Sequence, residues 1–510
     1  MEGILSSRNV RIFTVGFMAS WAGIWSGMAN AQTETGEPTS SPAPAAVEVP
    51  MATPPMSPPP PAAPPVVVPT TPVAAPAPAA EAKEPDPFAF ADFGWMNGQS
   101  RQIDYPLLGK VLNPMFTIDV GYNYEFSNPV DHTIVGSTSS GRHNELQIMH
   151  LGLGTDINYN GARGRLMTQL GLYSTMTPRN DGSPDRGQWN LRDAYKYITE
   201  GYGGYHWNVN SGINADAGIF LSYVGLCSYY NYENWTNQAS YVSSNTPWFF
   251  NGVRIQWFPT DKLKIEPWII NGWQSYGEFN NMPGLGFQIA YRPTGAIALV
   301  VSGYYGKDTM GDTHRGRFHT DNSLLIKYLE MPDSWLSKAA FSLTVDAGCE
   351  TGDGVQCANG NSTTPSQYFL GAMLYNRLWF DHNLFGLTIG GGLMTNPGRY
   401  LVLTPPINGA TAYYQASTYF PQTPGLGFKA WDTTETFDYM PTQNITFRAE
   451  YVHRWANTPY FVGHGGVTPP VPGAPGNYAN TGGPGSAVDG WAPDLQKNED
   501  RLTINLMVRI

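Results

Sequence analysis

The last eleven residues of the chain, Asp500 to Ile510, read D-R-L-T-I-N-L-M-V-R-I and carry the strongest fold signal. Side chains of a β-strand alternate between two faces. One face here is purely aliphatic (Leu502, Ile504, Leu506, Val508, Ile510), and the other is mostly polar and ends with Arg509. This pattern predicts the closing strand of a membrane β-barrel, with lipid outside and water inside. An edge strand of a soluble sheet is the alternative.

The N-terminus has the features of a secretory signal. Arg8 and Arg11 precede an apolar stretch, and Ala29-Asn30-Ala31 forms a small-x-small cleavage pattern before Gln32. Residues 1–31 are therefore predicted to be a signal peptide, with an uncleaved anchor as the alternative. No other segment approaches 18 consecutive apolar residues, so the mature chain is predicted to lack a transmembrane helix. Barrel strands would not show such a run, because they alternate.

The composition fits an exported barrel. Glycine (56), tyrosine (29), phenylalanine (23) and tryptophan (15) are plentiful, whereas charged residues make up only 14%. The mean hydropathy of −0.29 argues against a helical membrane protein. A net charge of −11 argues against nucleic acid as a partner.

Two segments precede the predicted barrel. Residues 32–87 contain 18 of the 43 prolines and no periodic pattern, which predicts a disordered periplasmic linker. Its role is either a passive spacer or a tether that contacts the cell wall. Residues 88–114 form a transitional segment with the aromatic sequence F-G-W-M-N-G at 93–98. This segment is expected to pack at the periplasmic mouth or to plug the lumen.

The region 115–510 reads as short alternating segments, each long enough to cross a bilayer as a tilted strand. We predict one all-β, antiparallel, up-and-down transmembrane barrel of about sixteen strands, with fourteen or eighteen as alternatives. The predicted strands are 115–126, 145–158, 162–174, 195–207, 212–224, 247–258, 262–272, 284–292, 296–306, 318–329, 338–349, 367–380, 383–394, 428–440, 445–455 and 500–510.

The connections between these segments alternate in length. Short turns such as 159–161, 259–261 and 441–444 alternate with long loops such as 225–246, 395–427 and 456–499. Membrane barrels have short periplasmic turns and long external loops. A soluble sandwich gives no reason for this alternation.

The charged faces of the predicted strands must look inward, because a cation facing mid-bilayer lipid costs about 2–4 kcal/mol. Arg292 and Asp346 share this inward face with the candidate pore-lining residues. Those candidates are Asp119, Glu125, Arg163, Arg165, Arg254, Lys264, Glu266, Lys327, Arg377, Arg448, Glu450, Arg454 and Arg509. Cations outnumber acids in this set, which suggests a weak preference for anions. A salt-bridged wall without net selectivity is the alternative.

The loop 225–246 is rich in aromatic residues and supplies candidate constriction residues. Such a loop can fold into a wide barrel and narrow its lumen, and stacked aromatics could line a sugar path. Packing on neighbouring external loops is an equal alternative. The candidates are Tyr229, Tyr230, Tyr232, Trp235 and Tyr241.

The three cysteines suggest one disulfide and no metal site. Cys349 and Cys357 bracket a short loop that an oxidising compartment could close, with two free thiols as the alternative. Cys227 is left over as a small apolar residue. The spacing suits no common zinc site, and Glu350 with Asp353 falls short of a calcium cage. We therefore predict no metal and no cofactor.

Several short motifs resemble those of the β-barrel porin-2 family, the OmpL-like porins. Residues 188–195 read Q-W-N-L-R-D-A-Y and are similar to the family's L-R-D-A-Y signature. The aromatic segment 93–98 and the block from Pro441 to Tyr451 are similar to other family blocks, so the resemblance covers roughly residues 93–510. It implies an outer-membrane barrel that acts as a passive pore. Two features depart from the family pattern: the terminal Ile510, where many such proteins end in an aromatic residue, and the proline-rich segment.

The expected function is a porin of the cell outer membrane. Small hydrophilic solutes or ions would diffuse through a water-filled lumen, and lipid would surround the wall. The alternative is a plugged structural or surface-binding barrel, tethered toward the cell wall by its linker. No G-x-S-x-G, H-E-x-x-H or P-loop pattern appears, so no enzymatic activity is expected. The sequence identifies no subunit contact, and a homo-oligomer stays open.

Overall fold

The computed structural model describes residues 85–103, 105, 107–178, 181, 183, 187–361, 366–398, 427–468 and 494–510. The predicted signal peptide (1–31) and residues 32–84 of the predicted linker lie outside the described residues. The central parts of the predicted loops 395–427 and 456–499 also lie outside them.

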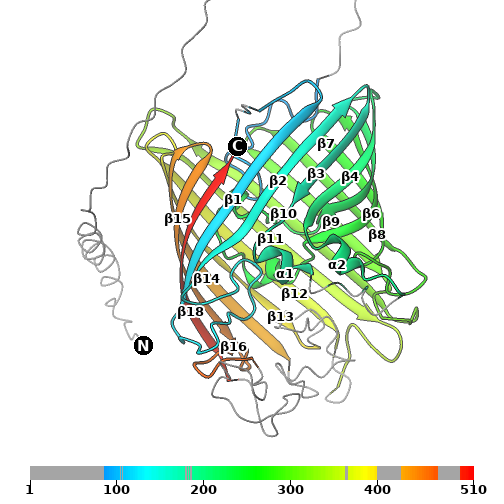
Figure 1. The fold of residues 1–510 in the computed structure, drawn as a ribbon, viewed down its shortest axis with the longest axis vertical. Coiled ribbons are helices and arrows are strands. Elements are labelled where there is room, and N and C mark those ends of the chain that lie inside the picture. Colours follow the sequence, from blue (N-terminus) through cyan, green and yellow to red (C-terminus); the bar gives the residue numbers. More distant parts are fainter. Residues whose placement is uncertain are drawn as a thin grey trace, which may run out of the picture. The chain divides into compact units, whose positions relative to one another are not determined.

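Sixteen antiparallel strands close into one barrel, in which each strand pairs with its sequence neighbours and β18 closes the wall between β15 and β1 (Figure 1). The predicted all-β up-and-down barrel is confirmed. The strands are β1 (Leu112–Glu125), β2 (Leu146–Tyr159), β3 (Ala162–Thr168), β4 (Ile198–Trp207), β5 (Ile213–Leu221), β6 (Phe249–Thr260), β7 (Leu263–Ile270), β8 (Gly284–Thr294), β9 (Ile297–Gly306), β10 (Gly316–Glu330), β11 (Leu336–Thr351), β12 (Tyr368–Phe380), β13 (Phe385–Asn396), β14 (Phe428–Thr442), β15 (Ile445–Ala456) and β18 (Asn498–Arg509). A separate two-stranded sheet pairs β16 (Phe461–Val462) with β17 (Leu495–Gln496).

Two predicted strands, 162–174 and 195–207, are longer than the strands that the structure has. β3 ends at Thr168, and the chain then forms the short helix α1 (Tyr173–Met176) after Gly171, whose φ of +96° leaves the extended region. β4 begins only at Ile198, because helix α2 (Leu191–Tyr195) occupies the residues before it. The Asn190 side chain caps α2 by accepting from the Asp193 N–H.

The closing strand has the predicted orientation. Val508 and Ile504 of β18 lie opposite Ile118 and Tyr122 of β1. Ile504 faces outward with 49% exposure, whereas its neighbour Asn505 is 2% exposed and faces the lumen. The aliphatic face therefore forms part of the outer wall.

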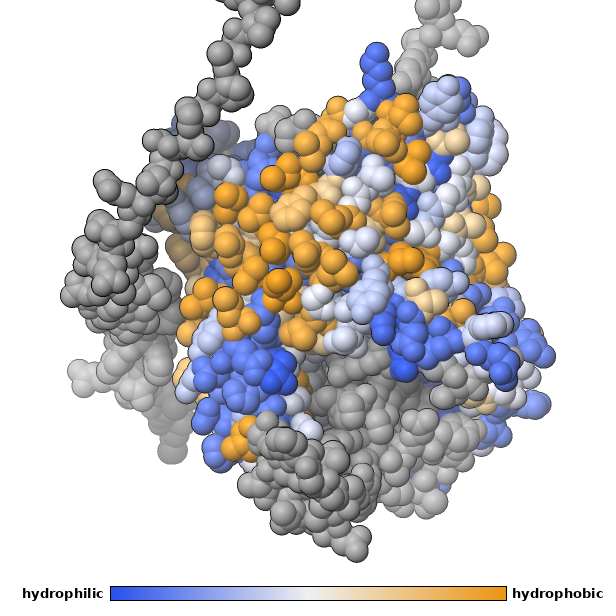
Figure 2. Space-filling model, viewed as in Figure 1, coloured by the Kyte–Doolittle hydropathy of each residue, from blue (hydrophilic) through white to orange (hydrophobic). Residues whose placement is uncertain are grey.

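The outer wall carries an apolar band between two more polar rims (Figure 2). Outward residues near the middle of strands, such as Ile255 on β6 and Ile289 on β8, are aliphatic and exposed. No helix among the described residues is long and apolar enough to cross a membrane.

Arginine in place of Ile255 tests that this band meets hydrocarbon. We expect Ile255→Arg to lower the free energy of unfolding by about 2–4 kcal/mol in lipid vesicles, measured by urea titration, because the cation loses its hydration at mid-membrane. Arginine in place of Leu263, which lies beside the β6–β7 turn, should cost only about 0–1 kcal/mol. Equal costs at the two positions would contradict a lipid-facing band.

Candidate functional site

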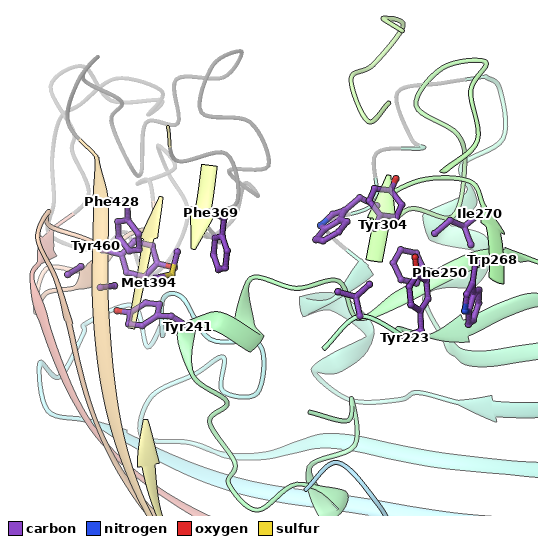
Figure 3. Packing of buried hydrophobic residues seen from close by; sticks show 14 of the residues in the cluster. Tyr223, Tyr241, Phe250, Trp268, Ile270, Tyr304, Phe369, Met394, Phe428 and Tyr460 are labelled. Atoms are coloured by element: carbon purple, nitrogen blue, oxygen red, sulfur yellow. The ribbon is translucent and has the colours of Figure 1, made fainter. Parts of the chain in front are cut away.

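The loop between β5 and β6, residues 222–248, crosses the barrel interior; we call it the lumen loop. At the start of the loop, Tyr223 stacks on Phe250 of β6 and on Trp268 of β7, with ring centroids 5.1 and 4.8 Å apart. Farther along the loop, helix α3 (Tyr241–Ser244) packs against β12, β13 and β14 on the opposite side of the barrel. We call β12 to β15 the far wall. Figure 3 shows these two groups of buried residues facing each other, with Tyr241 among Phe428, Tyr460 and Met394.

Inward acids of the far wall hold the backbone of the lumen loop. The Glu450 carboxylate accepts the N–H groups of Asn237 and Gln238, at 2.5 and 2.6 Å. Asp432 accepts the Tyr241 N–H at 3.0 Å and the Ser240 hydroxyl at 2.7 Å. A backbone N–H removed from water needs such a partner. These carboxylates therefore fix the path of the loop across the lumen.

All five candidate constriction residues lie inside the barrel. Tyr229 and Tyr230 pack with Tyr173 and with methionines of β2 and β3. Tyr232 stacks on Tyr230 at 5.5 Å. Trp235 meets Trp379 of β12 edge-on at 5.6 Å, and Tyr241 reaches the far wall. The aromatic run thus spans the lumen from one wall to the other. It also contacts neighbouring loops, since Tyr241 packs with Tyr460 and Phe461 and the Tyr229 hydroxyl donates to the Thr177 hydroxyl.

The candidate pore-lining residues all take inward positions, where most cations are paired with an acid. Asp438 bridges Arg377 and Arg448 at 2.8 and 2.7 Å, and Glu499 bridges Arg454 and Arg501. The other pairs are Arg163 and Arg254 with Asp216, Arg165 with Asp156 and Glu200, Lys264 with Glu266, Lys327 with Glu330, and Arg509 with Glu233. Asp119 accepts from the amides of Asn231 and Asn505, and Glu125 is fully buried near Glu499.

Sequence reasoning missed several of these acids, notably Asp216, Asp432, Asp438 and Glu499. The candidate pore-lining residues contain more cations than acids only because these acids were left out of the set. A signal for two of them was present, because Asp432 and Asp438 alternate with Trp431, Phe437 and Tyr439 along the predicted strand 428–440. Arg292 is different, since it has no carboxylate partner among the residues that the structure describes.

Residues 85–111, which we call the mouth segment, lie against the short-turn end of the barrel. The Trp95 indole donates to the Gly295 carbonyl at 2.9 Å, and Arg101 donates to the Ile445 carbonyl at 2.6 Å. Burial lowers the pKa of Arg101 to about 10. Cations of the wall lie over its aromatic rings: Arg292 over Phe88 and Phe93 at 4.7 and 4.3 Å, Lys262 over Phe90 at 5.6 Å, and Lys327 over Trp95 at 5.9 Å.

The mouth segment and the lumen loop meet inside the barrel. The Gly98 N–H donates to the Glu233 carbonyl at 3.1 Å, and the Trp235 N–H donates to the Asn97 side chain at 3.0 Å. Gly98 has a φ of +78°, and a Cβ there would lie 2.1 Å from the Leu226 carbonyl oxygen. A cavity beside this junction has a volume of about 20 Å³, which is room for about one water.

The cysteines lie in two different settings. Cys349, near the end of β11, forms a disulfide with Cys357 in the loop that follows, and their Cα atoms are 5.2 Å apart. The neighbouring Glu350 binds Arg315 and Arg317, so its carboxylate is engaged by guanidinium groups. Cys227 lies in the lumen loop, where burial raises its pKa to about 12. Within the described part of the chain, no cluster of His, Cys, Asp and Glu could hold a metal ion.

A closed antiparallel barrel with an apolar outer band, a charged interior and an inward loop defines the class of outer-membrane pore proteins. The chain belongs to the family described as "Putative beta-barrel porin-2, OmpL-like", whose model matches residues 117–469. It is thus a porin of the outer membrane, and its short turns face the periplasm.

Solved porin structures are similar to the chain over most of its length. OmpT of Vibrio cholerae, in trimer form, shares 9% identity over 78% of this chain and 99% of its own, with a TM-score of 0.43. The channel DcaP of Acinetobacter baumannii shares 11% identity over 78% of this chain and 97% of its own, with a TM-score of 0.43. OprB of Pseudomonas putida shares 10% identity over 79% of this chain and 94% of its own, with a TM-score of 0.44. No curated protein matches the chain.

Removing Asp438 tests the contribution of the buried charge network. Asp438→Ala leaves Arg377 and Arg448 buried without their shared acid, so we expect a loss of about 3–5 kcal/mol in the free energy of unfolding. Asp438→Asn should lose less, because the amide oxygen still accepts hydrogen bonds. The matched control is Asp193→Ala, which removes an exposed pair with Lys196 and should cost under about 1 kcal/mol. Similar losses for both alanine variants would contradict a buried network.

Proposed function

We propose that this porin passes small hydrophilic solutes by passive diffusion, without enzymatic chemistry, along the space between the lumen loop and the charged wall. The observation that supports this route is the crossing of the lumen by residues 222–248, which inward carboxylates of the wall hold in place. Strands alone would leave a lumen wide enough for water. The loop therefore sets the size of the solute that passes.

The groups beside this path suit uncharged polar solutes. A cavity of about 10 Å³ next to the lumen loop is lined by hydroxyl, amide and aromatic side chains: Ser139, Tyr173, Ser228, Tyr229, Asn231, Asn234, Asn237 and Trp248. Tyrosine and tryptophan rings with neighbouring amides present both an apolar face and hydrogen-bonding groups. The cavity itself has room for about one water, so it indicates only the chemistry of the lining. From that chemistry we infer that hydroxyl-rich solutes, such as small sugars, suit the path.

The paired charges support a pore with little net selectivity, apart from Arg292. We propose that the pore-lining candidates named above contribute mainly as neutral ion pairs. Arg292 lies at the periplasmic mouth, on β8, and carries a charge without a carboxylate beside it. An unbalanced cation at a constriction favours anions. The weak anion preference that the sequence suggested is therefore assigned to this residue.

Reversal potentials in a salt gradient test this assignment. We expect the full-length porin in planar bilayers to show a weak anion preference in a KCl gradient, and Arg292→Gln to shift the reversal potential toward cations. The double variant Lys264→Gln with Glu266→Gln is the control, because it removes an ion pair of 2.8 Å on the neighbouring strand β7, leaves the net charge unchanged and should leave the reversal potential unchanged. A strong cation preference of the unmodified porin would contradict the proposal.

The mouth segment supports a second proposal, that of a porin closed at its periplasmic end. Trp95, Asn97 and Arg101 join the mouth segment to the wall and to the tip of the lumen loop. Solutes that leave the lumen must pass this segment, so we infer that its displacement opens the pore. Residues 32–84 of the predicted linker 32–87 precede the segment. We propose that they connect the gate to the periplasm and contact the cell wall.

Deleting residues 85–102 tests whether the mouth segment obstructs the pore. We expect the single-channel conductance of the shortened porin to rise several-fold, because the obstruction at the periplasmic mouth is gone. Trp95→Ala combined with Arg101→Ala should increase the frequency of openings without changing the fully open conductance. An unchanged conductance and opening frequency would show that the segment does not gate the pore.

A further inference from the structure

The cavity at the junction of the mouth segment and the lumen loop has charged groups from all three parts of the protein in its lining. Among the residues that the structure describes, these groups are the guanidiniums of Arg101, Arg377 and Arg448 and the carboxylates of Glu233 and Asp438. The mouth segment supplies Arg101, the lumen loop supplies Glu233, and strands β12, β14 and β15 of the far wall supply the other three. A ligand in this cavity would therefore contact the segment, the loop and the wall at once.

Both acids of this lining are already engaged by arginines. Asp438 is shared between Arg377 at 2.8 Å and Arg448 at 2.7 Å. Glu233 binds Arg509 at 2.8 Å. With the guanidinium of the mouth segment, four guanidinium groups beside the cavity stand against two carboxylates, as far as the described residues show. The junction therefore carries an excess of two positive charges.

Arg101 is the arginine of this group that lacks an acid. Its guanidinium donates to the Ile445 carbonyl at 2.6 Å and to the Thr446 hydroxyl at 2.9 Å, and both acceptors are uncharged. No carboxylate in the described part of the chain forms an ion pair with it. Burial is the main cause that lowers the pKa of Arg101 to about 10, and the charges of two wall arginines lower it further against the opposing charge of Asp438. An anion beside this guanidinium would offset that repulsion.

The Tyr232 hydroxyl of the lumen loop supplies a hydrogen-bond donor to the same cavity. It is removed from solvent and has no hydrogen-bond partner within the described ranges. A phenolic hydroxyl has one hydrogen to donate, and leaving it unused in a buried place destabilises the folded state. The guanidinium carbon of Arg509 lies 4.9 Å from the centroid of its ring. The cavity thus combines an excess of positive charge with an O–H donor, which is the environment that binds an anion.

The size of the cavity selects among anions. Its volume of about 20 Å³ is room for about one water. A carboxylate or a phosphate group has several non-hydrogen atoms and needs more space, whereas a halide ion is close to a water molecule in size. The lining therefore suits a single monatomic anion.

We propose that a chloride-sized anion binds in this cavity, between Arg101 of the mouth segment, Tyr232 of the lumen loop and the arginines of the far wall. The anion accepts a hydrogen bond from the Tyr232 hydroxyl and offsets the charge of Arg101. It thereby ties the mouth segment to the loop and to the wall. The consequence for the pore rests on the gate proposed above: bound halide favours the closed state.

Hydrogen–deuterium exchange tests the site without reference to the pore. The full-length porin, reconstituted into vesicles, is compared in sodium chloride and in sodium gluconate at equal concentration, because gluconate is too large for the cavity. We expect the amides of residues 85–102 to exchange several-fold more slowly in chloride, since an anion that binds only the closed arrangement stabilises it by mass action. Equal exchange rates in the two salts would overturn the proposal.

Three variants test the partners of the anion. Tyr232→Phe keeps the ring and removes only the hydroxyl, so we expect the chloride concentration at half-maximal protection to rise roughly tenfold, because a hydrogen bond to a charged group is lost. Arg101→Gln should abolish the difference between the two salts. Lys110→Gln removes the same charge from an exposed residue of the mouth segment and should preserve the difference. A chloride effect that survives Arg101→Gln, or that Tyr232→Phe leaves unchanged, would overturn the proposal.

Single-channel recordings separate the anion site from the gate. We expect the unmodified porin to open less often in chloride than in gluconate, because bound halide holds the mouth segment in place. Slower exchange in chloride with an unchanged frequency of openings would support the anion site and contradict the gate.

Discussion

The structure depends on one constraint: every backbone N–H and C=O within the hydrocarbon must find a partner inside the protein. A closed antiparallel barrel meets it, because no strand is left with a free edge. The last strand therefore pairs on both sides, with β15 and with β1. Even the terminal residue takes part, since Ile510 and Phe116 exchange two hydrogen bonds of 2.9 Å. The period-two alternation follows, as each strand separates lipid from the lumen.

The same constraint acts inside the barrel, where side chains meet it. The lumen loop carries backbone N–H groups into a confined space, and Glu450 and Asp432 accept them. Asp438, Glu499 and Asp216 each hold two arginines, so most of the buried charges have a partner of opposite sign. The interior charges therefore stabilise the loop and the wall as well as lining the pore. The path for solutes is correspondingly narrower than sixteen strands alone would leave.

Local pattern predicted the strands well and failed where local signals compete. The predicted strands 162–174 and 195–207 overran because Gly171 and the Asn190 cap start turns and helices that the alternation does not reveal. The interior site was predicted in part: the inward arginines were found, but their acids on 428–440 were not. Glu435 explains this omission, because an outward carboxylate contradicts the rule that charged faces look inward. In the structure, the register of β14 against β15 places Asp432 and Asp438 inside the barrel.

The sequence by itself determined the strands, their two faces and the alternation of short turns and long loops. These properties depend on neighbouring residues, and a period of two is enough to express them. Only the tertiary structure decided which acid meets which arginine, that residues 222–248 cross the lumen, and that the mouth segment meets their tip. Many of these contacts join residues far apart in the sequence, as in the bonds of Asn237 to Glu450 and of Trp235 to Asn97, which span 213 and 138 positions. They arise because the wall closes and brings opposite strands within reach across the lumen, which no local pattern records.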